Sequence, residues 1–520
     1  MLKHSLLERY SSKIVSNLLV MILGILNVTL LPRALGPVHY GNFSFLSDSF
    51  NKIVSFATLN TQMAHFVYIS KDNADPKYTK FYIWLCLIVG FLVLVLIPLS
   101  YYLGIGNYLW PNQRIYLVVL AAVSGILIFY SFNVIQVADG KAATVGCEKI
   151  RRWVTLLAIM VLVLLYTTKN LNLEVYFIYS ILITLLLIVA VGRFLQSRVI
   201  TNIRSVNLDR DAIREISHYF YNYSYPLVTT MIIGFFIGYL DRWLLQIAYG
   251  STEQAYYGLG MKLSLLPVFF ATAFSPLLTQ GISQAHNVKN IDRIRALLLR
   301  ARMFYFIAAF MSLFLVFHAE SIIQWSAGAE YKDAVSSMRF MMFYPIHQTY
   351  GILLGDALLA LGLTRVYRNV SIGAALFGLP LTFLLLFPKS YLIPGLELGA
   401  VGLAFKMVLI QVIAVGAIVY SIRDYFSVSI IRELLHQIIV LLTLGVICYL
   451  GVIVVGQFKS VFLDNIWGQL LQIGITGTVY TMIVGGVCWM YPMLAGISKV
   501  EIRNMFKMMY NHKPHIEIKN

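Results

Sequence analysis

The sequence predicts an all-α membrane protein with about fourteen transmembrane helices, and two observations support this class. The first is composition. Of the 520 residues, 59% are hydrophobic and only 12% are charged, whereas soluble domains contain about 25% charged residues. The second is arrangement, because apolar runs of membrane length recur along the chain between short polar segments. A soluble protein would instead spread its polar residues along amphipathic helix faces.

The apolar runs define the expected membrane-spanning helices. The six runs of the first half are residues 14–31, 43–69, 81–103, 115–137, 154–166 and 175–194. The eight runs of the second half are residues 219–247, 255–282, 303–325, 338–361, 371–387, 399–420, 434–455 and 467–491. The run 154–166 is short unless its helix extends back through Arg151 and Arg152. The first run is too long for the core of a signal peptide, so we expect it to remain in the mature protein.

A polar, basic segment at residues 196–218 separates the two halves. The expected organisation is an N-terminal six-helix lobe at 1–195, a cytoplasmic linker at 196–218, a C-terminal six-helix lobe at 219–421, and an extra two-helix segment with a basic cytoplasmic tail at 422–520. Because six crossings precede the linker, the second lobe restarts in the orientation of the first, which predicts parallel repeats. Short echoes such as Tyr40-Gly41 and Tyr257-Gly258 support a repeat.

The net charge of +17 follows the membrane topology. With a cytoplasmic N-terminus, 29 Lys and Arg residues fall on the inner side and 7 on the outer side. Basic residues accumulate in cytoplasmic loops, so we expect both termini to be cytoplasmic in a cytoplasmic (inner) membrane. The same distribution argues against nucleic acid as a partner. The connecting loops are too short for a nucleotide-binding domain and contain no P-loop motif, so we expect no ATP hydrolysis.

The four cysteines show no metal-ligand spacing, and we expect no metal site and no cofactor. They lie in or beside apolar runs, as small buried side chains do. They are Cys86, Cys147, Cys448 and Cys488.

Ionisable residues inside the apolar runs are candidates for function, because each costs roughly 2.5–3.5 kcal/mol to insert and usually faces the bundle interior or a wet cavity. Asp48 and Lys52 are four residues apart, so they share a helix face and can pair. A purely structural salt bridge is the alternative reading of that pair. Asp241 and Arg242 lie near the outer end of their run, where an interfacial anchor or a lobe-closing ion pair is the alternative.

Four further charges lie in the second half of the chain. Lys262, Arg339 and Lys406 have no acidic partner nearby in sequence, and we expect them to line a cavity. Asp356 lies deep in its run and is the favoured carboxylate for a response to protons or other cations.

The first outer corner contains Arg33-x-Leu35-Gly36-x-x-x-Tyr40-Gly41-x-Phe43. This corner resembles the polysaccharide flippases, which export O-antigen and capsule repeat units within the multidrug/oligosaccharidyl-lipid/polysaccharide exporter superfamily. Further similar segments follow in order at residues 241–245, 256–263, 328–331 and 398–404. The resemblance spans the chain from about the first helix to the twelfth. That family usually has twelve helices and sometimes fourteen, so the extra pair leaves the subfamily open.

The resemblance implies that the protein translocates oligosaccharide repeat units linked to undecaprenyl diphosphate, by alternating access between two lobes around a cationic cavity. A diphosphate needs cations to replace its water, and Arg and Lys supply charge-assisted hydrogen bonds. The candidate residues for the diphosphate are Arg33, Lys52, Arg242, Lys262, Arg339 and Lys406. For Arg33, a structural turn cap is the alternative. The candidates for coupling to protons or sodium are Asp48, Asp241 and Asp356.

The expected partners are the lipid-linked oligosaccharide, membrane lipids and the polysaccharide polymerase machinery. A monomer is the default, because each chain contains both lobes. Three other functions compete with this one. A multidrug and toxin extrusion antiporter shares the fold but should favour acidic residues, since its substrates are cationic. A lipid II flippase is also fourteen-helical and cation-lined. A membrane enzyme such as an O-antigen polymerase or ligase would need a long outer loop with catalytic basic residues, which this chain lacks.

Overall fold

The structure is a computed structural model that describes residues 6–59, 61–69, 75–141, 143–198, 206–389, 394–423, 430–457 and 466–496. The helices up to residue 287 are α1 (Leu6–Ala57), α2 (Thr61–Ile69), α3 (Pro76–Tyr102), α4 (Gly106–Leu109), α5 (Ile115–Gly140), α6 (Thr144–Thr167), α7 (Leu173–Arg198) and α8 (Arg210–Asn287). Those that follow are α9 (Ile291–Phe317), α10 (Ala319–Ser326), η1 (Ala329–Tyr331), α11 (Ala334–Met341), α12 (Tyr344–Ala360), α13 (Thr364–Leu386), α14 (Gly399–Ser421), α16 (Ile430–Gln457), α17 (Ile466–Met490) and η3 (Pro492–Ala495).

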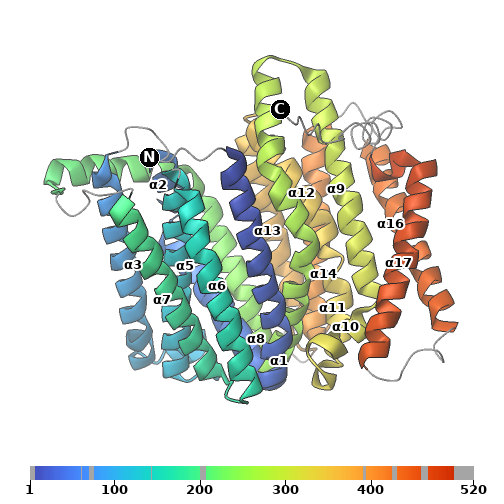
Figure 1. Cartoon of the computed structure of the whole chain (residues 1–520), viewed down its shortest axis with the longest axis horizontal. Coiled ribbons are helices and arrows are strands. Elements are labelled where there is room, and N and C mark those ends of the chain that lie inside the picture. The colour runs from blue at the N-terminus through green and yellow to red at the C-terminus, as the bar shows by residue number, and fades with distance from the viewer. Residues whose placement is uncertain are drawn as a thin grey trace, which may run out of the picture. The chain divides into compact units, whose positions relative to one another are not determined.

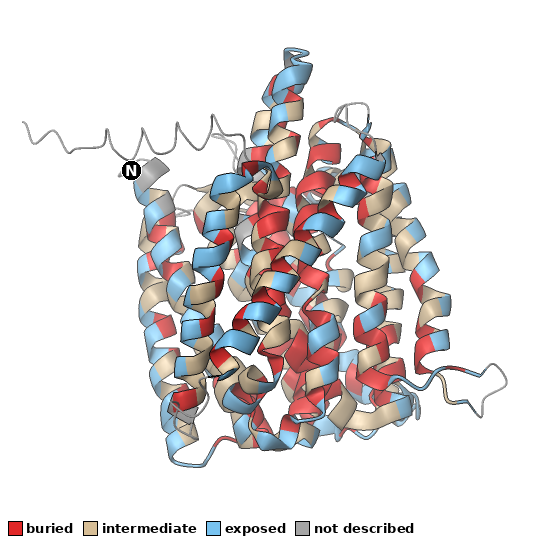
Figure 2. Cartoon of the chain, turned by 90° about the vertical axis from the view of Figure 1, so that its right-hand side faces the viewer, coloured by how far each residue is buried: buried red, intermediate tan, exposed pale blue. Residues whose placement is uncertain are grey.

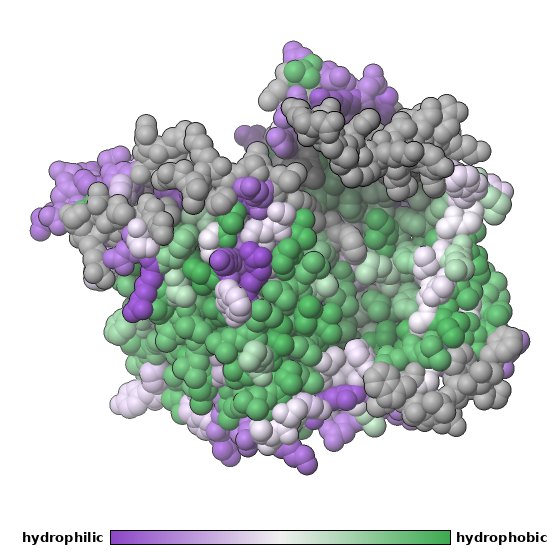
Figure 3. Space-filling view, in the orientation of Figure 1, coloured by the Kyte–Doolittle hydropathy of each residue, from purple (hydrophilic) through white to green (hydrophobic). Residues whose placement is uncertain are grey.

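The expected all-α polytopic membrane fold is confirmed. The described residues contain no strand, and eleven of their helices are long and apolar enough to cross a membrane. All fourteen expected runs fall on helices. Helices α1 and α8 each contain all or part of two runs, and the runs 43–69, 303–325 and 338–361 are each divided between two helices. On the visible face, hydrophobic side chains cover the middle of the helices and hydrophilic ones gather toward their ends (Figure 3). A lipid bilayer imposes this distribution on the helices that cross it.

Glycine kinks divide the two longest helices. Gly36 has φ 69° and ψ 172° inside α1, and Gly250 has φ 76° and ψ −169° inside α8. This backbone region is essentially restricted to glycine. Each kink therefore turns the chain between two consecutive crossings without a loop, and the two corners share one backbone conformation.

Three expected runs are interrupted. The run 303–325 breaks at His318, between α9 and α10. The run 43–69 breaks after Ala57, where Leu59 has a positive φ of 47°, and continues as α2. The run 338–361 breaks between α11 and α12, and Pro345 lies in the first turn of α12. Proline lacks the backbone N–H that a continuous helix needs, and it is well tolerated where a new helix begins.

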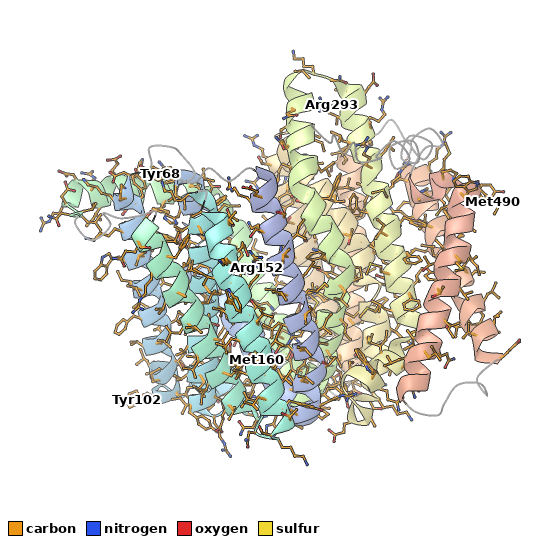
Figure 4. All side chains as sticks on the ribbon, viewed as in Figure 1. Tyr68, Tyr102, Arg152, Met160, Arg293 and Met490 are labelled. Carbon is orange, nitrogen blue, oxygen red and sulfur yellow. The ribbon has the colours of Figure 1, made fainter. Side chains whose placement is uncertain are left out.

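The helix that contains the short apolar run 154–166 is longer than that run. This helix, α6, begins at Thr144 and includes Arg151 and Arg152. Polar partners hold this charged first half: Glu148 is fully buried and pairs with Arg151 at 3.2 Å. Arg152 donates to the Ser12 hydroxyl of α1 at 3.2 Å. Figure 4 shows Arg152 part-way along α6.

The chain divides by internal packing into two compact units. Unit 1 comprises Met1–Gly258, Ser326–Lys332 and Thr382–Leu403, and unit 2 comprises Leu259–Trp325, Asp333–Leu381 and Ala404–Asn520. The first boundary between these units lies inside α8, after Gly258. The lobe boundaries suggested by the sequence remain a prediction.

Each unit has its own apolar core. In unit 1, α1, α5, α6 and α7 pack side by side (Figure 1). In unit 2, α9, α12, α16 and α17 share a continuous cluster of buried residues, in which Phe310 stacks on Tyr480 at 4.6 Å between ring centroids. The visible helices carry both buried and exposed residues (Figure 2). The two C-terminal helices are thus part of the core of unit 2.

Candidate functional site

A polar stripe runs along the second half of α1 in unit 1. Ser44, Asp48 and Lys52 follow one another at intervals of four residues, which places them on one helix face. The Lys52 ammonium donates to Asp48 Oδ2 at 2.6 Å and to the carbonyl oxygen of Gly238 on α8 at 2.7 Å. The pairing of Asp48 with Lys52 that the spacing predicts is therefore present in the structure.

Arg242 of α8 completes this cluster. Its Nε donates to Asp48 Oδ2 at 3.1 Å, and its two Nη groups donate to Gln254 Oε1 at 2.8 Å and to the Ser44 hydroxyl at 3.2 Å. The guanidinium also lies over the Tyr257 ring, 4.5 Å from its centroid. Arg242 is fixed on every side, and its side chain is only 8% exposed.

The cluster carries one net positive charge, because the single Asp48 carboxylate faces both Lys52 and Arg242. Lys52 is its accessible cation, with a side chain that is 30% exposed. An ammonium has three donors, and described residues use two of those on Lys52. The remaining donor can form a charge-assisted bond with an anionic oxygen of a ligand. We call Ser44, Asp48, Lys52, Arg242 and Gln254 the cationic cluster.

Two other candidate residues of unit 1 lie in different surroundings. Asp241 is buried and accepts a hydrogen bond from the Thr382 hydroxyl at 2.7 Å. Arg33 is exposed and donates through Nε to the Ser326 carbonyl oxygen at 3.1 Å, close to the Gly36 kink. Both residues of this contact belong to unit 1.

The remaining candidates belong to unit 2. Lys406 of α14 is 3% exposed, and its Cε would lie 3.1 Å from a β-carbon at Gly378, so glycine on α13 makes room for this side chain. The Ser275 hydroxyl of α8 donates to Asp356 of α12. Lys262 is partly buried on α8, whereas Arg339 is exposed on α11. No ion pair of Asp356 is formed by the residues that the structure describes.

Sequence reasoning missed the neutral members of the cationic cluster, Ser44 and Gln254, because they carry no charge. It also missed a second buried ion pair. Glu433 at the start of α16 is almost fully buried and accepts hydrogen bonds from Arg302 of α9 and from the Tyr350 hydroxyl of α12, the latter at 2.8 Å. In the sequence, Arg302 is one of several basic residues beside a predicted cytoplasmic loop. A carboxylate directly before the apolar run 434–455 was the available signal.

A family model described as "Polysaccharide biosynthesis protein" matches residues 6–282, which is more than half of the chain. The chain belongs to this family. The match covers the whole of α1 and most of α8, and therefore every residue of the cationic cluster. No curated protein matches the chain at a significant level.

Solved structures with the same fold extend over more of the chain. One titled "Lipid II flippase MurJ, inward closed conformation" is 16% identical, covers 93% of this chain and 99% of its own, and has a TM-score of 0.67. An inward-facing multidrug resistance MATE family transporter of the MOP superfamily is 13% identical, covers 81% of this chain and 99% of its own, and has a TM-score of 0.64. At these identities the likeness establishes the fold alone. This polysaccharide biosynthesis family member therefore has the fold of those membrane proteins.

Proposed function

We propose that this protein is a flippase that moves undecaprenyl-diphosphate-linked oligosaccharide repeat units from the inner to the outer leaflet of the cytoplasmic membrane, for the synthesis of a surface polysaccharide of the O-antigen or capsule type. Membership of the polysaccharide biosynthesis family supports the pathway. The fold shared with a lipid II flippase supports the type of transport. The termini would lie in the cytoplasm, as the distribution of basic residues predicts.

The cationic cluster is the observation that carries the proposal. Charges within a membrane segment are costly and usually mark a substrate or ion pathway. Here two cations share one carboxylate, and the more accessible cation, Lys52, keeps a donor for a ligand. A diphosphate is the part of the proposed substrate that has the opposite charge. The cluster is thus matched in charge to an anionic headgroup.

The same net charge argues against a multidrug cation antiporter, because a cationic substrate would meet repulsion at Lys52 and Arg242. A lipid II flippase remains the second candidate. The observation that favours it is coverage, since the structural likeness to that flippase includes 93% of this chain. The substrates of both candidate functions contain a polyprenyl diphosphate, and these substrates differ in the attached sugars.

The proposed mechanism is alternating access driven by an ion gradient. Among the three candidate carboxylates, Asp48 already pairs with two cations and Asp241 accepts from Thr382. Asp356 has the Ser275 hydroxyl as its described partner and no ion pair among described residues. A carboxylate without a bound cation is best suited to reversible binding of a proton or sodium ion. We therefore assign the coupling role to Asp356 within this proposal.

The test is a lipid extract from a strain that lacks the gene, analysed by mass spectrometry for polyprenyl-diphosphate oligosaccharides. We expect complete repeat units to accumulate and surface polymer to be lost, and wild-type complementation to reverse both. Lys52→Gln should fail to complement, with at least a tenfold loss of export (roughly 1.4 kcal/mol). Lys52→Arg should complement largely, because it keeps the charge. Arg114→Gln, which removes an exposed cation at the start of α5, is the matched control and should complement fully.

Other lipid profiles would contradict the proposal. An accumulation of lipid II in place of other repeat units would assign the protein to the second candidate function. Unchanged lipid-linked sugars combined with altered drug sensitivity would instead indicate a drug antiporter.

A further inference from the structure

Unit 1 contains a cavity apart from the cationic cluster. It has a volume of about 430 Å³ and lies between α2, α3, α5 and α7. This volume is in the range of about 300–1,000 Å³ that is typical of small-molecule sites. Most of its wall is apolar, and includes Ile83 and Leu87 of α3, Val134 of α5 and Ile188 of α7.

The cavity runs along the helices and opens toward the bilayer. Its wall extends from Thr79 to Leu87 on α3 and from Ile188 to Gln196 on α7, or about 12 Å at 1.5 Å per residue. Ile83 and Leu87 are also 45% and 51% exposed at the surface. Both α3 and α7 have the length and composition of membrane-spanning helices. The medium at this opening is therefore lipid, and the long axis of the cavity has the direction of a lipid chain.

Polar groups gather at one end of the cavity. Thr79 lies in the first turns of α3, and its hydroxyl is 3.2 Å from Nε2 of His65. The His65 ring stacks on Tyr82 with 4.3 Å between centroids. About one turn deeper, Asn133 of α5 lines the wall and is 93% buried, and neither atom of its amide has a hydrogen-bond partner among the described residues. A buried amide without a partner is costly in an apolar medium, so this amide is suited to a polar group of a ligand.

A glycine leaves room for that ligand. A β-carbon added at Gly192 of α7 would have no heavy atom within 4 Å, although Gly192 belongs to the cavity wall. A larger side chain at this position can therefore enter the cavity without a clash. Gly24 of α1 also has no heavy atom within 4 Å of an added β-carbon, and it lies outside the cavity. The two glycines form a matched pair for substitution.

We propose that this cavity binds one acyl chain of a bilayer phospholipid, with the ester group of the chain at the polar end formed by His65, Thr79 and Asn133. The apolar wall fits the hydrocarbon, and the amide and hydroxyl groups fit the ester. A polyprenyl chain also fits the apolar wall but has no ester for Asn133. The proposal does not depend on which substrate the protein transports.

The experiment uses the full-length protein in vesicles of phosphatidylethanolamine and phosphatidylglycerol that contain a phosphatidylglycerol with a photoreactive acyl chain. After illumination, labelled peptides are identified by mass spectrometry. We expect labels on the segments 79–87 and 188–196. Gly192→Leu should reduce these labels about tenfold, and Gly24→Leu should leave them unchanged. Labelling of the outer faces of other helices reports on equal probe content in all samples.

A second variant and a second probe complete the test. Asn133→Leu replaces the amide by an apolar side chain of similar volume, and we expect it to reduce labelling by the phospholipid. If Gly192→Leu does not fold, Asn133→Leu takes its place in the test. If neither Gly192→Leu nor Asn133→Leu reduced the labels on the two segments, the labels would not come from a chain inside the cavity. That result would overturn the proposal. A photoreactive polyprenyl diphosphate that labels the cavity more strongly than the phospholipid would also overturn it, because the occupant would then be the chain of a transported substrate.

Discussion

At the scale of single residues, the central feature is a carboxylate that serves two cations. Asp48 lies within hydrogen-bonding distance of Lys52 and of Arg242, and the latter is more than 190 positions away in sequence. Insertion of each isolated charge would cost roughly 2.5–3.5 kcal/mol, and mutual pairing offsets part of this cost. Arg242 of α8 makes two bonds to α1, to Asp48 and Ser44, in addition to the bond of Lys52 to α8.

Arg242→Lys should therefore destabilise the protein although it keeps the charge. A lysine ammonium cannot reproduce the directed bonds to Asp48, Gln254 and Ser44, nor the planar contact with Tyr257. We expect a loss of about 2–3 kcal/mol, measured as a lower melting temperature of the purified protein in one detergent.

The matched control is Arg33→Lys, in which an exposed arginine with a bond to the Ser326 carbonyl is replaced. This change should cost under about 1 kcal/mol. If both variants melted at the same temperature, the guanidinium geometry of Arg242 would have no structural importance.

At the scale of elements, α1 and α8 approach each other closely in unit 1, and small residues make this possible. A β-carbon at Gly41 would fall 1.6 Å from the Ser251 carbonyl oxygen, and one at Gly258 would fall 2.1 Å from the Ser44 hydroxyl. The second contact matters for the site, because Ser44 is one of the acceptors for Arg242. Helix spacing and the geometry of the cationic cluster are therefore coupled.

Gly258→Ala should separate the helices or displace Ser44, at a cost of about 1–3 kcal/mol, and should lower export with it. Thermal melting and complementation measure the two effects. Gly234→Ala is the control, because an added β-carbon there meets no heavy atom within 4 Å. Replacement of this helical glycine should be neutral or stabilise by up to about 1 kcal/mol. Ser44→Gly removes the clashing atom, so the double variant should recover part of the lost stability. No recovery would mean that another contact causes the defect.

A buried ion pair between Glu433 and Arg302 joins α16 to α9 in unit 2. Glu433→Gln should cost about 3–5 kcal/mol, because it leaves the Arg302 guanidinium without its counter-ion in a partly buried place. The measurement is again the melting temperature.

Removing both charges should be less harmful than removing one, since two apolar side chains leave no unpaired charge. We expect Glu433→Leu combined with Arg302→Leu to be more stable than either single variant. Additive losses in a double-mutant cycle would show that the two residues act independently.

At the scale of the whole molecule, much of the fold follows from hydrophobic runs. The lengths of these runs predict the helices. Helix α6 is longer than its run, because Glu148 pairs with Arg151 and the Ser12 hydroxyl accepts a hydrogen bond from Arg152. The candidate site is less predictable. Spacing predicts the Asp48–Lys52 pair, since both residues lie on one helix, but periodicity contains no information on Arg242 as their partner or on Gln254 and Ser44. Such contacts depend on which helices become neighbours.

The orientation in the membrane is also a prediction from sequence, and cysteine labelling tests it. Val288 is 70% exposed in the turn between α8 and α9, and Figure 4 shows Arg293 near the tip of this hairpin. Val288→Cys should react with a membrane-impermeant maleimide only in inside-out vesicles. Tyr102 is the last residue of α3, is 88% exposed and lies on the predicted outer side. Tyr102→Cys should therefore react in intact cells.

The native cysteines provide a low background, because Cys86, Cys147 and Cys448 are buried and Cys488 is partly buried. Reaction of Val288→Cys from outside the cell would place the termini on the opposite side from the one predicted.

The two glycine kinks have a consequence at the level of the gene. Every nonsynonymous single-nucleotide change in a glycine codon encodes either a residue with a β-carbon or a stop signal. At φ 69° and 76° with ψ near 180°, a residue with a β-carbon is sterically strained. No single-nucleotide change in the codons for Gly36 and Gly250 therefore gives a different amino acid without a loss of stability. In a saturation library selected for surface polymer, these two codons should tolerate synonymous changes only, whereas the codon for Gly24, in an ordinary stretch of helix, should accept alanine.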